Sequence, residues 1–252
     1  EPGNPNILYA QWQQGNLVRI DVPTGEVTYI RPQPEEGEDY ERYNWDAPIF
    51  VSPHNPKRIY HGSQRLWRSD DRGDSWKAVS PDLTKDQERI ELPIMGRKQS
   101  WDNPWDLYAM SNFSTITSIA ESPLQEGLIY IGTDDGESWT EVPVSKLSGV
   151  PSTAYVNDIK ADLFDANTVY VALDDHKGGD FKPYLFKSTN AGKTWTNIGS
   201  TLPDKHLVWR LVQDHVDKDL FFIGTEFGIF FSVDAGARWT KLKGGMPALP
   251  VR

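Results

Sequence analysis

Three acidic residues have the chemistry of general acid–base catalysis, and each lies next to a short apolar segment: Asp46, Asp134 and Glu226. Cleavage of a glycosidic bond with inversion needs two carboxyl groups about 6.5 to 9.5 Å apart, one of them with a raised pKa. Asp46 and Asp134 belong to different segments, so only the fold determines their separation. The sequence alone therefore assigns no catalytic residue, and the three carboxylates are candidates only if the protein is a hydrolase. The chain has no motif for serine or phosphate-loop chemistry. It has no Cys, which excludes thiolate zinc sites and cysteine nucleophiles.

A second set of residues offers stacking surfaces or hydrogen bonds to a ligand. Trp101 and Trp105 lie in a long polar loop, which makes that loop the best candidate contact surface. The segment 174–180 has oxygen ligands for Ca²⁺ but lacks the spacing of a calcium loop, so a solvated hairpin tip is favoured and we expect no metal and no cofactor. For Trp45 and Trp209, buried packing or an interface is favoured over a stacking surface for sugars. The ligand-binding candidates are Trp45, Arg65, Trp101, Trp105, Asp175, His176, His206, Trp209 and Arg210.

The elements that must position these residues are short β-strands. The 252 residues carry 26 basic and 36 acidic side chains, and the net charge of −10 disfavours nucleic acid. The apolar segments are too interrupted for membrane spans. Glycines and prolines separate β-branched and aromatic runs, and no window shows a helical period, so the sequence predicts an all-β protein.

Internal repeats indicate which all-β fold forms. An apolar strand with a central aromatic residue recurs five times, at intervals close to or above the roughly 40 to 50 residues of a four-stranded propeller blade. We expect the aligned residues to occupy equivalent positions in successive sheets. These residues are Tyr9, Tyr60, Tyr130, Tyr170 and Phe222.

A turn motif, Ser-x-Asp/Asn-x-Gly-x-x-Trp, follows three of these strands. In a tight turn, the Asp or Asn accepts backbone N–H bonds, the Gly takes a positive φ, and the Trp packs between sheets. Because the motif repeats, a structural role is favoured over a catalytic one. Its residues are Ser69, Asp71, Gly73 and Trp76, then Ser188, Asn190, Gly192 and Trp195, then Ser232, Asp234, Gly236 and Trp239.

The motif resembles the Asp-box, or bacterial neuraminidase repeat, of β-propellers. The surrounding segments 44–56, 65–69 and 224–228 most resemble the sortilin-like N-terminal propellers of large bacterial proteins, many of which carry a glycosyl hydrolase label. The resemblance implies an Asp-box β-propeller and an extracytoplasmic location. It implies little about activity, because the Asp-box is a turn device.

We expect about five blades, around residues 7–45, 46–112, 113–154, 155–206 and 207–246, with a loop insertion at 92–112. If the aromatic strand is second in each blade, the acidic and ligand-binding candidates share one rim and the turns lie on the other. The third repeat is short between Tyr130 and Trp139. Either it has lost a strand, or residues are missing from it.

Two functions follow from these patterns. The favoured one is a non-catalytic binding or scaffolding propeller that holds a protein or peptide, and the alternative is a glycoside hydrolase that cleaves a polysaccharide through rim Asp and Glu residues. Five blades without a closing strand would leave unpaired strand edges, so we also expect the chain to be an incomplete part of a larger propeller. Further blades or a protein partner would cover these edges, near Phe230, Phe231 and Leu249.

Overall fold

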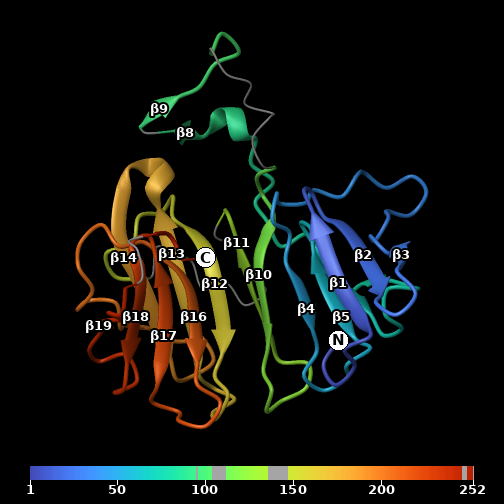
Figure 1. Ribbon diagram of the computed structural model, residues 1–252. Coiled ribbons are helices and arrows are strands. Elements are labelled where there is room, and N and C mark those ends of the chain that lie inside the picture. The colour runs from blue at the N-terminus through green and yellow to red at the C-terminus, as the bar shows by residue number, and fades with distance from the viewer. Residues whose placement is uncertain (95, 104–111, 136–146, 246–248, 252) are drawn as a thin grey trace.

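A computed structural model describes residues 1–94, 96–103, 112–135, 147–245 and 249–251. In these ranges the chain forms β-strands and two short 3₁₀ turns, η1 (Arg89–Glu91) and η4 (His176–Gly178), with no α-helix (Figure 1). No helix of the described chain is long and apolar enough to cross a membrane. The all-β prediction is confirmed.

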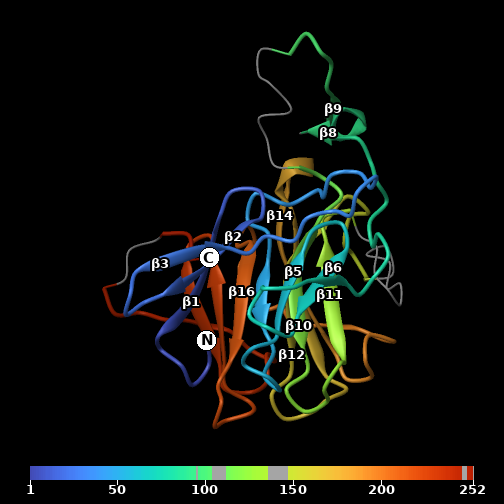
Figure 2. The ribbon, with the colours of Figure 1, turned by 90° about the vertical axis from the view of Figure 1, so that its right-hand side faces the viewer.

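Five main sheets follow one another along the chain, and their strands pair in sequence order. Figures 1 and 2 show the sheets standing around a common axis, which is the arrangement of a β-propeller. Sheet one is β1 (Ile7–Trp12), β2 (Asn16–Asp21) and β3 (Glu26–Tyr29); sheet two is β4 (Ile49–Val51), β5 (Ile59–Gly62), β6 (Leu66–Ser69) and β7 (Lys77–Ala78); sheet three is β10 (Ile116–Glu121) and β11 (Ile129–Thr133); sheet four is β12 (Tyr155–Ala161), β13 (Val169–Asp175), β14 (Asp180–Ser188) and β15 (Thr196–Asn197); sheet five is β16 (Val208–Gln213), β17 (Phe221–Thr225), β18 (Gly228–Ser232) and β19 (Thr240–Lys241).

The strand register confirms the predicted alignment of aromatic residues. In sheets two to five the aligned residue lies in the second strand, and in sheet one it lies in β1. Tyr9 pairs with Arg19 of the next strand as Tyr60 pairs with Arg68. Strand β1 is therefore equivalent to the second strand of the four-stranded sheets.

The register also separates two ends of the sheets. Residues at the start of each first strand lie beside residues at the end of the second, as the pairs Ile49–His61 and Tyr155–Asp174 show. We call this end the loop rim. The opposite end, where each third strand turns into the fourth, carries the Ser-x-Asp/Asn turns, and we call it the turn rim. This is the predicted arrangement.

At the turn rim, one set of hydrogen bonds recurs in sheets two, four and five. In sheet two, Ser69 Oγ donates to Asp71 at 2.7 Å and accepts the N–H of Gly73 at 2.7 Å. Asp71 accepts the N–H of Ser75 at 2.9 Å, and the Trp76 indole donates to the carbonyl of Ile30 in the preceding segment at 2.6 Å. Ser188 and Ser232 make the equivalent bonds in sheets four and five.

Two successive residues of each turn have positive φ. Gly73 has φ +91°, and the preceding Arg72 has φ +65°. The same pairs occur at Ala191–Gly192 and Ala235–Gly236. A Cβ on Gly73 would lie 2.6 Å from Ile30, so this position excludes other residues both by conformation and by space.

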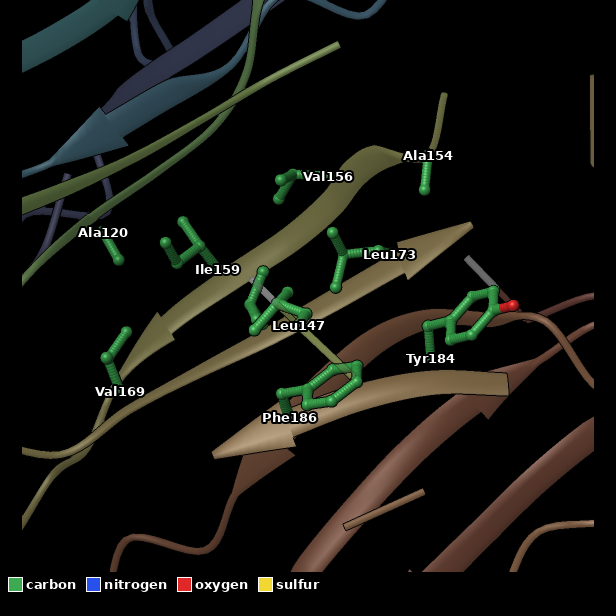
Figure 3. Close-up of a cluster of buried hydrophobic side chains, with 10 residues drawn as sticks. Ala120, Leu147, Ala154, Val156, Ile159, Val169, Leu173, Tyr184 and Phe186 are labelled. Atoms are coloured by element: carbon green, nitrogen blue, oxygen red, sulfur yellow. The ribbon is translucent and has the colours of Figure 1, made fainter. Parts of the chain in front are cut away.

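Each contact between consecutive sheets has its own apolar cluster. Figure 3 shows the cluster between sheets three and four, where Ile159, Val169 and Phe186 are buried. Three further clusters lie between sheets one and two, two and three, and four and five. The core is thus a series of layers, and each sheet packs on its neighbours.

The predicted insertion 92–112 leaves the body of the protein at the loop rim. Its described part is not only a loop, because β8 (Pro93–Ile94) and β9 (Arg97–Lys98) form a small hairpin above the rim (Figure 1). Strand β8 contacts η4 of sheet four. The predicted shortening of the third repeat lies largely at 136–146, outside the described residues.

Candidate functional site

Asp134 is a buried carboxyl group at the loop rim of sheet three. It follows β11, and its two oxygens accept the N–H and the hydroxyl of Thr115 at 2.8 and 2.9 Å. Burial, helped by the neighbouring Asp135, raises the pKa of Asp134 to about 6 against the opposing effect of the Thr115 hydrogen bonds. An acid with this pKa holds a proton close to neutral pH and can release it, as a general acid must.

A chain of hydrogen bonds connects Asp134 with the segment that carries Asp46. The Asn44 amide donates to Thr115 Oγ1 at 3.0 Å, and Thr115 in turn contacts Asp134. Asn44 Oδ1 accepts the N–H of Asp46 at 3.2 Å. The structure therefore brings the rim segments of sheets two and three together, and Asp46 is exposed there.

Two cations that the sequence reasoning missed lie near Asp134. Lys177 Nζ lies 4.9 Å from the centre of the Tyr155 ring, and the Arg89 guanidinium lies 5.4 Å from that of Phe113. Burial lowers the pKa of both, and Asp134 opposes this shift in each case. Arg89 comes from η1, just before the insertion and outside the repeated segments, so no repeat pattern could have placed it.

Sheet four contributes a second group of polar side chains. Asp174 is fully buried at the end of β13 and accepts from both the backbone N–H and the Nδ1 of His176. The Tyr155 hydroxyl lies 3.0 Å from the same Nδ1. Asp175 is buried beside it, and burial raises its pKa.

Sheet five supplies the predicted residues on the other side of this group. The Trp209 indole donates to Glu226 at 2.9 Å, and its ring meets His176 edge to face at 6.0 Å. His206 packs on Phe227 instead, with ring centres 5.1 Å apart. Arg210 is bound to Asp158 at 3.1 Å. Trp209 and Glu226 therefore belong with His176, whereas His206 and Arg210 have other contacts.

Sheet two holds the remaining candidates in other surroundings. Arg65 is bound to Glu38 and to the buried Glu41, both at 2.6 Å, and lies over the Trp67 ring. These contacts fix the segment before β4 and occupy the guanidinium. Trp45 is partly exposed at the same rim.

The insertion presents one of its two predicted tryptophans in the described chain. Trp101 is 74% exposed, and Trp105 lies outside the described residues. Where the structure describes the chain, no group of three or more His, Asp or Glu residues has the arrangement of a metal site.

Two acceptor oxygens near the rim are buried without a hydrogen bond in the described chain. They are Asp135 Oδ1 and Asp174 Oδ2. A buried acceptor without a partner is costly, and such atoms in native proteins call for a ligand, a water or a functional reason. The cluster of Asp134, Asp135, Asp174, His176 and Lys177 is the candidate site. The groove of about 470 Å³ between sheet one and the first turn lies at the turn rim, away from this cluster.

Comparison with known proteins gives partial matches in sequence. No protein-family model matches the chain. It is 28% identical over 147 residues to a xyloglucanase from a Paenibacillus species, and this match covers 50% of this chain and 14% of the relative. It is 27% identical over 148 residues to xyloglucanase Xgh74A of Acetivibrio thermocellus, which covers 51% and 18%. The chain thus spans less than a fifth of the length of these relatives.

Solved structures agree on the fold. The GH74 xyloglucanase of Xanthomonas campestris superposes with a TM-score of 0.64 at 20% identity, over 97% of this chain and 37% of that one. The extracellular domain of a one-component-system protein of B. thetaiotaomicron has a TM-score of 0.55 at 13% identity, over 99% and 28%. These similarities support the propeller fold.

The matches correct one prediction from the sequence. We expected a non-catalytic binding or scaffolding propeller, because the only strong motif is structural. The relatives that match in sequence are enzymes, and this contradicts that expectation. They favour the alternative, a glycoside hydrolase. The turn motif misled because it reports on the scaffold and carries no information about the opposite rim.

Proposed function

We propose that the protein is a glycoside hydrolase that cleaves a polysaccharide at the loop rim, with Asp134 as the general acid and Asp46 as the general base. The observation that carries the proposal is the buried Asp134 carboxyl group with its raised pKa, connected through Thr115 and Asn44 to the Asp46 segment. The exposed Asp46 carboxylate has access to water, as a base that activates water requires.

The substrate class is proposed from the relatives. The proteins that match in sequence are xyloglucanases, so xyloglucan is the first substrate to test. The chain matches only a small part of each, and its own substrate is part of the proposal.

The test is hydrolysis of xyloglucan and of a panel of other polysaccharides, measured as released reducing ends. A general acid or base contributes about 10² to 10⁴ in rate, so Asp134→Asn and Asp46→Asn should each lose at least about a hundredfold in kcat. Glu36→Gln, an equivalent change at an exposed carboxylate elsewhere, is the control. Wild-type rates should also fall as the pH rises above about 6, because Asp134 then loses its proton. Full activity of Asp134→Asn would refute the assignment.

We also propose that the five sheets are five Asp-box blades of a larger, sortilin-like propeller, with sheet three as the third blade. The recurring Ser-x-Asp/Asn turns support the Asp-box assignment. The larger ring is supported by two apolar sheet faces without a neighbour in the described chain. One belongs to sheet one, where Leu8, Trp12, Val27 and Tyr29 are exposed, and the other to sheet five, where Val212 is exposed beside Phe222 and Phe231.

The contacts of Val251 favour a further blade as the structure that covers the apolar face of sheet five. Ile116, which begins sheet three, donates its N–H to Ser63 at 2.7 Å and covers Gly62. Val251 donates its N–H to Thr225 at 3.0 Å and covers Gly224, at the equivalent positions of sheet five.

The position of Phe230 corrects the predicted contact surface. Phe230 is buried against sheet four, while Phe231 faces outward.

Sedimentation of the 252-residue chain tests this reading. Apolar faces without a covering blade should make the chain associate as its concentration rises, and Val27→Lys with Tyr29→Lys should reduce the association. Val216→Lys, at an exposed apolar residue outside both faces, is the control. A monodisperse chain that unfolds cooperatively would contradict the proposal.

An extracytoplasmic location completes the proposal. A polysaccharide is too large to enter a cell intact, so an enzyme that cleaves it must work outside the cytoplasm. Fractionation of the native cells with an antibody against the chain tests this, and recovery in the cytoplasm alone would contradict it.

A further inference from the structure

The imidazole of His176 is held in one orientation by sheet four. Its Nδ1 contacts the Asp174 carboxylate and lies 3.0 Å from the Tyr155 hydroxyl, and Asp174 also accepts the His176 backbone N–H at 3.0 Å. Asp174 has no exposed surface, so water does not compete for its oxygens. Both the ring and its backbone are therefore anchored to one buried group.

These contacts fix the tautomer of the ring. The Asp174 carboxylate only accepts, so the Nδ1 that faces it must carry the proton. In the neutral ring, Nε2 is then an acceptor. Every hydrogen bond of the imidazole to a described residue is made by Nδ1, and the side chain is 34% exposed. The ring thus offers a pre-oriented acceptor at the loop rim.

Trp209 lies beside this acceptor and is held by another carboxylate. Its ring meets His176 at 6.0 Å and 69°, and its indole N–H is bound to Glu226. The anchored N–H fixes the plane of the indole ring. A ring fixed in this way can stack on an apolar surface of a ligand without losing further rotamer freedom.

Asp134 is close to the same place. Lys177, the residue after His176, interacts electrostatically with both Asp134 and Asp174 and covers the Tyr155 ring. The short turn η4 therefore meets Trp209 through His176 and interacts with the proposed acid through Lys177.

We propose that His176 and Trp209 form a sugar-binding subsite next to Asp134 that selects a neutral polysaccharide. This inference rests on the proposed function for the class of ligand. A pyranose ring has a hydroxyl that donates to Nε2 and a C–H face that stacks on the indole. Even with Asp134 protonated or replaced by Asn, the three aspartates at 135, 174 and 175 outnumber the two cations Lys177 and Arg89, so the negative field of the cluster disfavours uronic acids. Asp174 is a positioning residue, which acts through His176.

Binding to the inactive Asp134→Asn protein tests the subsite without catalysis. The probes are xyloglucan oligosaccharides, as the neutral ligand, and oligogalacturonate, as the acidic one, measured by calorimetry. We expect binding of the neutral probe only. Adding His176→Phe, which keeps a ring and removes both nitrogens, should weaken binding about tenfold, the effect of one hydrogen bond. Trp209→Ala should weaken it by at least as much, and His215→Phe, at an exposed histidine, should leave it unchanged.

Kinetics of the active enzyme give a second readout. His176→Phe should raise KM about tenfold and change kcat less, because the subsite binds the substrate and takes no part in proton transfer. Equal binding by Asp134→Asn with and without His176→Phe would overturn the subsite, as would preference for the acidic probe or no binding at all. Hydrolysis by Asp134→Asn at the wild-type rate would instead overturn the proposed acid, and the KM of the His176→Phe enzyme would still test the subsite.

Discussion

At the turn rim, Asp71 and Asp234 accept hydrogen bonds from hydroxyl and N–H groups of their own turns, and these bonds lower the pKa of each to about 2. At the loop rim, burial raises the pKa of Asp134 to about 6. The same residue type thus titrates about four pH units apart at the two ends of the sheets. Where three turns repeat one arrangement, the Asp or Asn of each is satisfied by its own turn. The loop rim differs from sheet to sheet and holds buried acceptors that have no partner among the described residues. Repetition therefore identifies the scaffold, and its absence identifies the candidate site.

The largest expected effect on stability comes from replacing a glycine at the turn rim. A Cβ at Gly73 would overlap Ile30 and hold a positive φ, so Gly73→Ala should destabilise the protein by roughly 4 kcal/mol. Gly37 has a similar φ of +90° and nothing within 4 Å of an added Cβ. Gly37→Ala should therefore cost only about 1 kcal/mol. Urea unfolding measures both, and equal losses would show that packing between the sheets contributes nothing.

The pH dependence of stability should have opposite signs at the two rims. The folded pKa of Asp134 lies above its unfolded value of 3.8, so its stabilising contribution is complete below pH 3.8 and is lost as the pH rises through about 6. The loss is about 3 kcal/mol. The folded pKa of Asp71 lies below 3.8, so its contribution is present above pH 3.8 and is lost as the pH falls towards 2.

Urea unfolding of the wild type and the Asp134→Asn and Asp71→Asn variants between pH 2.5 and 7 measures these contributions. The difference between wild type and variant is the quantity to follow, because it cancels the titration of other groups. The buried His61 is one of them, since burial lowers its pKa to about 4. Parallel curves for the two variants would contradict the contrast between the rims.

A smaller difference is expected between two of the turn tryptophans. The Trp76 indole donates across to Ile30 of the preceding segment, and the Trp195 indole donates within its own turn, to Gly192. Trp76→Phe should cost about 1.5 kcal/mol, because it leaves a carbonyl between sheets without its donor. Trp195→Phe should cost less, since its hydrogen bond lies within one turn and joins no second sheet. Thermal unfolding of the two variants decides this, and the reverse order would count against a role for Trp76 between sheets.

The smallest expected effect is a gain in stability from a substitution in the turn of sheet four. Asn190 replaces the aspartate of the other turns, and its amide donates to the Thr194 hydroxyl at 2.8 Å. In Asn190→Asp the hydroxyl would donate to a carboxylate instead, as Ser75 does to Asp71. We expect a gain of about 0.5 kcal/mol at pH 7 that disappears below the pKa of the new group. A loss at pH 7 would show that the three turns are not equivalent.

Much of the scaffold could be predicted from the sequence, because local signals determine it. The period of the strands, the aligned aromatic residues and the Ser-x-Asp/Asn turns are visible within short windows. The candidate site is a different matter. Asp134 and Glu226 were identified by type and position, but the burial of Asp134 depends on how sheet three packs on its neighbours.

Arg89 and Lys177 were missed for a physical reason. Arg89 lies in η1, just before the insertion and outside the repeated segments, and Lys177 lies in a turn that resembles a solvated hairpin tip. Only the tertiary fold brings both beside Asp134. Arg65 is a ligand-binding candidate in the sequence, but its guanidinium is bound to Glu38 and Glu41 in the structure. These ion pairs could not be predicted, because both glutamates come from a segment with no recognisable pattern.

The step from one sheet to the next has a consequence for how the protein unfolds. A glycine near the end of the second strand, Gly62 or Gly132, receives the first strand of the following sheet, through Ile116 or Val156. Among the described residues, each apolar cluster thus joins two sheets that are consecutive in the chain, as in a linear array of coupled units. Amide hydrogen exchange should then be slowest in the middle sheets and faster towards the two outer ones. Thermal fluctuations open such an array from its ends, so the sheets that hold Asp134 and His176 are the last to lose their structure.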